Sequence, residues 1–251
     1  MKIFIINLEK SKDRRYAMQN KMGLLSQNPL YSKLHLEYEF FKATDSKSEE
    51  FLEYKKFYNP IACYMLHGIL LLDTEIACYA SHYRLWQECI KRQEPIIVLE
   101  DDINFEPHFL QGIQEICKSQ FPFVRFYFCK KNIKIKNRIK DSNFFWTLKT
   151  TNGTQGYYLT PQAAQKFVAQ KIWNGQVDTY MEYVLQHGID NIIYQPFLIS
   201  EDGSPTTIGG IRGSGNIKTI PLLYRILQPF YFHYRKLKRA FFKFYYTPPK
   251  L

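Results

Sequence analysis

The stretch EPIIVLEDDINFEP, residues 94–107, places three acids directly after a strongly apolar run. The run, residues 96–99, is typical of a strand buried on both faces of a sheet, and Glu100, Asp101 and Asp102 follow it at once. Like charges repel, and burial raises the free energy of every ionised carboxylate. A chain that folds this way needs a compensating cation or protons here, unless the acids form a water-exposed turn.

The segments around this stretch alternate between strand-like and helix-like patterns. We expect helices over 74–93 and 107–119 and another that starts at Thr160-Pro161. We expect strands over residues 2–8, 36–45, 123–129 and 191–200, and one or two within 143–159. This alternation predicts an α/β fold with a mostly parallel, mixed sheet. Ligands of such sheets bind outside the carboxyl ends of the strands, so the acids become a candidate site.

A divalent cation would resolve the repulsion among the three carboxylates. Mg²⁺ and Mn²⁺ prefer hard oxygen ligands and usually share one or two carboxylates with substrate phosphates. Side chains two apart on an extended segment point the same way, so Glu100 and Asp102 could face one ion while Asp101 meets a different partner. A solvated acidic turn is the alternative that the residues leave open.

Residues 201–216 are rich in glycine and mark a candidate boundary. They hold five of the twelve glycines and a proline. We therefore divide the chain into a domain over residues 1–215 and a C-terminal segment over 216–251.

The cysteines and the N-terminus indicate a cytoplasmic protein. The five cysteines are odd in number and show no zinc-ligand spacing, so we expect a reducing compartment and no zinc site. The apolar run near the N-terminus is too short for a signal peptide, and no segment is long enough to span a membrane. Attachment to a membrane surface stays open.

The net charge of +11 is concentrated in the C-terminal segment, where residues 220–251 contain seven Lys/Arg and no acid. Projected as a helix, residues 231–246 separate into a basic arc and an apolar arc, with Phe242 breaking the separation. The basic arc holds Arg235, Lys236, Lys238, Arg239 and Lys243, and the apolar arc holds Leu237, Ala240, Phe241, Phe244 and Tyr245. This pattern predicts a helix that lies on an anionic membrane. Packing on the domain or on a second subunit is the alternative.

The basic composition also suits two other classes of protein. A second basic run over residues 129–140 would fit a nucleic-acid-binding or nucleotidyl-transfer protein, and an acidic surface turn would fit a non-catalytic membrane-associated adaptor. We expect no nucleic-acid partner, because the excess charge lies mainly outside the alternating core and no recognised motif is present. No oligomeric state is predicted.

The motifs together resemble glycosyltransferase family 25, the lipooligosaccharide-biosynthesis family that includes collagen galactosyltransferases. They are IFIINLEKSKDRR, FFKATD, TEIACYASHYRLWQECI, EPIIVLEDDINFEPHF, GTQGYYLTPQAAQKF and VDTYM, and they fall in the family order within residues 1–200. The resemblance implies a GT-A type nucleotide-binding domain. It implies transfer with inversion from a UDP-sugar, most often UDP-galactose, to a lipooligosaccharide or lipopolysaccharide core. It places the enzyme at the inner face of a bacterial inner membrane.

The resemblance also suggests roles for individual residues. Asp102, helped by Glu100 or Asp101, would hold Mn²⁺ or Mg²⁺. The nucleotide-sugar would contact Asn7, Leu8, Arg14, Asp45, His82, Glu100, Asp101, Gly153, Thr154 and Gly156. The general base for inversion would be Asp178 or, second, Asp101. The simpler readings of His82 and Asp178 are a packing residue in a helix and a helix N-cap.

Overall fold

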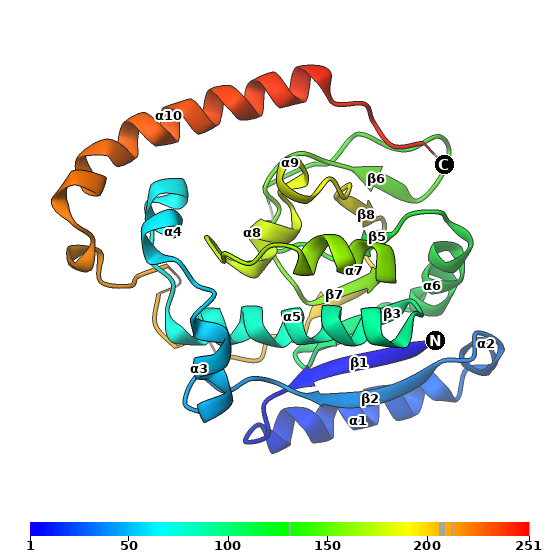
Figure 1. Ribbon diagram of the computed structural model, residues 1–251. Coiled ribbons are helices and arrows are strands. Elements are labelled where there is room, and N and C mark those ends of the chain that lie inside the picture. Colours follow the sequence, from blue (N-terminus) through cyan, green and yellow to red (C-terminus); the bar gives the residue numbers. More distant parts are fainter. Residues whose placement is uncertain (131, 206–208, 212, 251) are drawn as a thin grey trace.

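A seven-stranded mixed sheet forms the centre of the protein in this computed structural model (Figure 1). The structure describes residues 1–130, 132–205, 209–211 and 213–250. The strand order is β2 (Glu37–Lys42), β1 (Lys2–Asn7), β3 (Ile96–Glu100), β7 (Gly156–Leu159), β5 (Phe123–Arg125), β8 (Ile192–Tyr194) and β6 (Phe144–Trp146). Strands β2, β1 and β3 are parallel, β7 is antiparallel to both its neighbours, β8 is parallel to β5, and β6 is antiparallel to β8.

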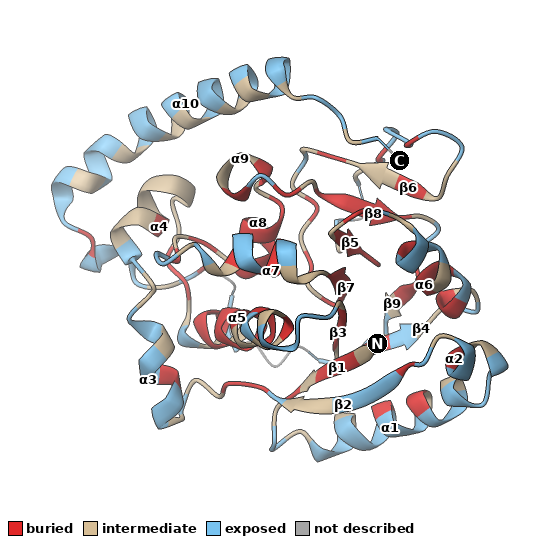
Figure 2. Ribbon diagram, turned by 45° about the vertical axis from the view of Figure 1, so that its right-hand side comes forward, coloured by how far each residue is buried: buried red, intermediate tan, exposed pale blue. Residues whose placement is uncertain are grey.

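Helices cover both faces of this sheet (Figure 2). They are α1 (Lys12–Ser26), α2 (Pro29–Lys33), α3 (Glu49–Lys55), α4 (Pro60–His67), α5 (Asp73–Arg92), α6 (Phe109–Lys118), α7 (Pro161–Val168), α8 (Val177–Met181), α9 (Val184–His187), a 3₁₀ turn (Ile217–Thr219) and α10 (Leu222–Tyr245). A small second sheet pairs β4 (Ile103–Phe105) with β9 (Ile199–Glu201). The expected α/β fold with a mostly parallel mixed sheet and a C-terminal helix is confirmed.

The central strand β3 shows why its sequence is apolar throughout. Ile96 and Val98 pack in the core under α5 and α7, whereas Ile97 and Leu99 pack in the core under α1 and α6. All four side chains have no exposed surface. Successive side chains of a strand point to opposite faces, so a strand covered on both sides has no polar position until it ends. The acids can therefore begin only at Glu100, where the strand leaves the core.

The structure modifies several of the expected boundaries. The strand expected over residues 123–129 is shorter, and the one expected over 191–200 divides into β8 and β9. Strand β4 was not expected. The glycine-rich stretch 201–216 includes residues 206–208 and 212, and the basic run 129–140 includes residue 131; these lie outside the described residues. The division at residue 215 stays a prediction.

The C-terminal helix α10 lies against the domain surface, crossing the region of α4 and α9 (Figure 1). None of its residues is buried, so it is a surface helix along its whole length (Figure 2). Within the described residues, no helix combines the length and the apolar character that crossing a bilayer requires. None of the five cysteines, all of which lie in the described part of the chain, forms a disulfide.

Gly156 shows how closely the two sheets approach each other. A Cβ atom on Gly156 would lie 2.6 Å from Ile199 Cδ1 and 3.0 Å from carbons of Leu99 and Phe126. We predict that Gly156→Ala lowers the free energy of unfolding by about 1–3 kcal/mol, because the added methyl overpacks the core. Urea denaturation measures this change.

The matched control is Gly23→Ala in the last turn of α1, where a Cβ atom would meet nothing within 4 Å. This change should raise stability by about 0.5–1 kcal/mol, because alanine loses less backbone entropy than glycine in a helix. Equal stabilities for the two variants would contradict the packing described here.

Candidate functional site

A cavity of about 270 Å³ lies where β1, β2 and β3 end. Residues that follow these three parallel strands line it, and the N-terminal parts of α1 and α5 contribute to its walls. Since β7 runs the other way, its amino end reaches the same edge and supplies Gln155. Residues after β9 close the cavity with Glu201, Gly203 and Ser204. This is the position at which α/β sheets bind ligands.

Asp101 joins β1 and α1 to the end of β3. Its Oδ2 accepts a hydrogen bond from Asn7 Nδ2 at 2.6 Å, and its Oδ1 accepts one from Arg14 at 2.9 Å. Burial raises the pKa of Asp101, whereas the hydrogen bonds from Asn7 and Arg14 act to lower it. Both carboxylate oxygens thus already have donors from the protein.

The hydrogen-bonding capacity of the Asp102 carboxylate is only partly used within the described residues. Its Oδ2 lies 3.4 Å from the Arg14 guanidinium, but its buried Oδ1 has no hydrogen-bond partner in the described structure. Burial and the nearby Glu100 raise the pKa of Asp102 to about 7. A buried carboxylate oxygen without a donor is unfavourable, so this atom is available to a proton or a cation.

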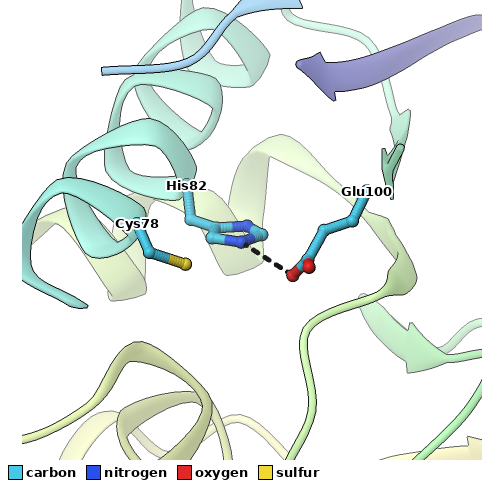
Figure 3. A group of neighbouring side chains, drawn as sticks. All are labelled: Cys78, His82 and Glu100. Carbon is cyan, nitrogen blue, oxygen red and sulfur yellow. Dashed lines mark ion pairs between the residues drawn. The ribbon is translucent and has the colours of Figure 1, made fainter. Parts of the chain in front are cut away.

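The Glu100 side chain points toward His82 on α5 (Figure 3). Its Oε1 accepts a hydrogen bond from the Thr154 hydroxyl and lies 3.6 Å from His82 Nε2. His82 is buried, and its Nδ1 lies 3.0 Å from the Tyr157 hydroxyl, which accepts from Trp86 Nε1. The buried Tyr157–Trp86 pair thus fixes the ring of His82 with Nε2 directed at Glu100.

Cys78, His82 and Glu100 form a group that could hold a metal ion (Figure 3). One ligand atom from each residue lies within 4.8 Å of the other two. Cys78 and His82 are four apart on α5 and therefore share a face of the helix. A sulfur–nitrogen–oxygen set suits zinc better than magnesium, whereas the oxygens of Glu100 and Asp102 suit Mg²⁺ or Mn²⁺. The expectation that no Cys/His ligand spacing is present was wrong for this pair, since Cys78 and His82 lie one helical turn apart.

The charges around the cavity also favour a divalent cation. Among the described residues, five carboxylates line it: Asp45, Glu100, Asp101, Asp102 and Glu201. The cations are Lys10 and Arg14, and both are already engaged, Lys10 with Asp45 at 2.7 Å and Arg14 with Asp101. An anionic ligand would be repelled from this surface unless a cation came with it. The residues therefore fit Mg²⁺ or Mn²⁺ held by Asp102 Oδ1 and Glu100.

A buried network holds the loop that carries Thr154. Arg125 and Glu182 form an ion pair of 2.5 Å with both side chains almost fully buried. Arg125 donates to the carbonyl oxygens of Asn152 and Gly153, and Glu182 accepts from the Thr151 amide and hydroxyl. These contacts fix the backbone of residues 151–153, which immediately precedes Thr154.

Asp178 belongs to this network rather than to the cavity wall. Its Oδ2 accepts from the Gly153 amide at 3.0 Å, and its Oδ1 accepts from the Thr179 amide at 2.6 Å. It is buried and is the second residue of α8, so the N-cap reading was wrong, since the N-cap is Gln176. Gly153 has φ +99°, a left-handed conformation that favours glycine. The role of Asp178 as general base stays a prediction.

The structure brings most of the expected donor-site residues together. Those lining the cavity are Leu8, Arg14, Asp45, His82, Glu100, Asp101 and Asp102. Asn7 and Thr154 lie just behind the wall and hold Asp101 and Glu100, respectively. Gly153 and Gly156 are not among the lining residues. Gly156 packs in the core instead.

Sequence reasoning missed several residues that line the cavity. They include Lys10, Cys78, Gln155 and Glu201. Glu201 is exposed and accepts a hydrogen bond from Gln155 at 3.2 Å. A signal for Glu201 was present, because Glu201 and Asp202 directly follow an expected strand, as the first three acids do. The Cys78 signal was its spacing from His82.

The C-terminal helix presents its residues differently from the expectation. Lys236, Lys238, Lys243, Phe241 and Phe244 are exposed as expected. Arg235 and Arg239 instead turn toward the domain, where Arg235 lies 3.4 Å from His67 Nδ1 and Arg239 donates to the Leu148 carbonyl. The residues of the predicted basic arc therefore do not share one environment, because Arg235 and Arg239 contact the domain while the three lysines face solvent. Phe242, the aromatic residue that interrupts the predicted separation of basic and apolar faces, is half-buried on the side of α10 that faces the domain.

The amino-acid sequence of this chain is similar to those of known proteins. A family model described as "Glycosyltransferase family 25 (LPS biosynthesis protein)" matches residues 1–181. A glycosyltransferase 25 family member of Drosophila melanogaster is 29% identical over 186 residues, covering 68% of this chain and 28% of the relative. Procollagen galactosyltransferase 2 of Mus musculus is 29% identical over 188 residues, covering 66% and 27%. The chain thus spans less than a third of the length of these relatives.

One solved structure is also similar, a glycosyltransferase involved in the glycosylation of the major capsid of PBCV-1. It superimposes with a TM-score of 0.43 and 10% sequence identity, over 82% of this chain and 93% of that chain.

The buried Arg125–Glu182 pair gives a prediction for stability. Arg125→Met leaves the Glu182 carboxylate buried without its cation, so we expect a loss of about 3–5 kcal/mol in the free energy of unfolding. The double variant Arg125→Met, Glu182→Gln removes both charges and should recover a substantial part of that loss. Thermal or urea unfolding of these two variants, of the single variant Glu182→Gln and of the unchanged protein completes a double-mutant cycle and measures the coupling. Equal destabilisation by Arg125→Met and by the double variant would contradict the pairing.

Proposed function

This chain belongs to glycosyltransferase family 25, and we propose that it transfers galactose from UDP-galactose, with inversion, to the core of a lipooligosaccharide or lipopolysaccharide. The membership agrees with the family resemblance seen in the motifs. The family description, with its reference to LPS biosynthesis, supports a lipopolysaccharide acceptor, and the name of the mouse relative supports galactose as the sugar. The curated relatives named above are animal proteins, so the bacterial source stays a prediction.

The observation that carries the proposal is the buried, unpartnered Oδ1 of Asp102 in a cavity lined mostly by carboxylates. We propose that Asp102 and Glu100 hold Mn²⁺ or Mg²⁺, since both oxygens of Asp101 already accept hydrogen bonds from Asn7 and Arg14. When bound, such an ion would offset the negative charge that develops on the departing UDP diphosphate.

The residues of the chain would do the remaining work of binding and orientation. Arg14 holds the Asp101 and Asp102 carboxyl groups in position, and Asn7 anchors Asp101 from β1. Thr154 and His82 orient Glu100. Leu8 and Asp45, at the ends of β1 and β2, would line the nucleoside side of the cavity. The general base stays proposed as Asp178 or Asp101. Because Asp178 lies outside the lining residues and already binds two backbone amides, it needs a rearrangement to reach an acceptor hydroxyl.

We further propose that α10 docks the protein on the cytoplasmic face of an anionic membrane. The side of α10 that faces away from the domain carries an apolar ridge of exposed residues: Leu223, Ile226, Leu227, Phe230, Tyr234, Leu237, Phe241, Phe244 and Tyr245. A contiguous exposed apolar surface of this kind marks an interaction site. Exposed Lys236, Lys238 and Lys243 flank the ridge, so charge complementarity favours anionic headgroups as its cover.

The central test of the reaction is Asp102→Asn, which keeps the shape of the side chain and removes its charge. We expect galactosyl transfer or UDP-galactose hydrolysis in the presence of Mn²⁺ to fall by at least about 100-fold, the order of loss seen when one charge-stabilising group is removed. A radiolabelled-sugar assay across UDP-galactose, UDP-glucose and other UDP-sugars measures both the rate and the donor preference.

The matched control for this test is Asp141→Asn, a change at an exposed acid that does not line the cavity. It should leave the rate unchanged. Full metal-dependent activity in the Asp102→Asn protein would refute the assignment of the metal site.

The membrane proposal is tested by Phe230→Ser combined with Phe241→Ser, both on the apolar ridge. Each phenylalanine contributes about 1.5–3 kcal/mol when it leaves water, so binding to phosphatidylglycerol vesicles should weaken at least tenfold. Vesicle sedimentation measures the bound fraction. The control is Leu52→Ser on α3, an apolar residue of similar exposure away from α10. Unchanged binding of the double variant, or an equal loss in the control, would contradict docking through the ridge.

A further inference from the structure

The inner face of α10 carries two arginines that the proposed reaction does not use. Arg235 and Arg239 are four residues apart and so lie on the same side of the helix, the side turned to the domain. They line a pocket of about 150 Å³ between α10, the end of α4 and the α8–α9 segment. The pocket wall also includes His67, Thr150, Thr179 and Asn174.

This pocket has an excess of positive charge. Within the described part of the chain, neither guanidinium forms an ion pair with a carboxylate; Arg235 contacts a ring nitrogen of His67 and Arg239 donates to a carbonyl. Among the described lining residues the carboxylate is Glu182, and its oxygens are engaged by Arg125 and Thr151. The two arginines therefore repel each other with no countercharge from the protein close by.

The surroundings of Arg235 make this repulsion stronger than at an open surface. Burial and the neighbouring Arg239 lower the pKa of Arg235. Burial, reinforced by Arg235, lowers the pKa of His67 to about 4, so the imidazole is neutral at physiological pH and does not add a third charge. An unpaired charge removed from water raises the free energy of the folded state, and a bound anion would remove that cost.

We propose that this pocket binds a phosphate group, as a monoester or diester, between Arg235 and Arg239. Guanidinium groups match the geometry of phosphate oxygens with paired N–H donors. The hydroxyl of Thr150 and the amide of Asn174 are further donors among the residues that line the pocket. The volume of about 150 Å³ admits one phosphate group together with water.

The pocket is separate from the cavity at the strand ends, because the two share no lining residue. It adjoins a second hollow of about 220 Å³ along α10, which is lined by Arg235 as well and extends to Lys238. A phosphate bound here would fasten α10 to the α8–α9 segment. The inference therefore does not rest on the proposed reaction, and its test requires no enzymatic activity.

Hydrogen–deuterium exchange of the full chain tests the proposal at the site itself. Inorganic phosphate at ten times its dissociation constant should slow exchange of residues 174–186 and 235–240 about tenfold, as expected when a ligand suppresses local opening. Phosphatidylglycerol vesicles form the second arm. Protection of residues 174–186 is decisive in that arm, because the apolar ridge of α10 does not involve them. Protection by free phosphate would show that the phosphate group alone is sufficient for binding. Protection by vesicles but not by free phosphate would identify a lipid headgroup as the source of the phosphate.

Variants distinguish phosphate binding from simple anchoring of the helix. The double variant Arg235→Gln, Arg239→Gln should lose the protection in both arms, whereas Lys91→Gln, which changes an exposed cation on α5 away from the pocket and from α10, should keep it. If the glutamine variant releases α10, Arg235→Lys with Arg239→Lys keeps the charges and should retain protection, with a weaker dissociation constant. Absence of protection by either probe, or equal protection in the glutamine variant, overturns the proposal.

Discussion

The rest of the site depends on the hydrogen bond from Asn7 and the ion pair with Arg14 that hold the Asp101 carboxylate. These two contacts tie the ends of β1 and β3 to the first helix, and they place Asp102 beside the same guanidinium. One arginine between two carboxylates leaves a negative excess, and Glu100 increases it from the other side. The apolar strand β3 holds these charges at the sheet edge because none of its preceding four side chains can leave the core. A cation is the simplest partner for such an arrangement.

A second buried network controls the opposite wall. Arg125 and Glu182 hold the backbone of residues 151–153, Asp178 holds the Gly153 amide, and the loop then delivers Thr154 to Glu100. The polar groups that support the site are thus buried in pairs rather than exposed, as preorganisation requires. Asp178 and Glu182 belong to residues 174–186, and this segment also faces the inner side of α10. The loop at the cavity and the C-terminal helix are therefore supported by the same part of the chain.

The features that could be predicted from sequence are those that depend on local pattern. The burial of residues 96–99 and the acids after them placed the site at a strand end, and helix α5 followed from its apolar spacing. The contact of Asp178 with Gly153 could not be predicted, because Gly153 lies in a loop 25 residues earlier in the chain. A helical projection separated the faces of α10, but only tertiary packing decides which edge meets the domain, and this is why Arg235 and Arg239 were misplaced. Glu201 could have been predicted as a site residue in the same way as Glu100, because both acids come at the end of an expected strand.

The central claim is that the carboxylates at the end of β3 accept a nucleotide diphosphate only together with a divalent cation. Isothermal titration calorimetry of UDP-galactose binding, with Mn²⁺ and after its removal by chelation, tests this claim most directly. We predict that affinity falls by at least about 100-fold without the metal, since each 1.4 kcal/mol of lost interaction is a factor of ten. The dependence on Mn²⁺ should largely disappear in the Asp102→Asn protein. Equally tight binding of UDP-galactose with and without Mn²⁺ would contradict the account.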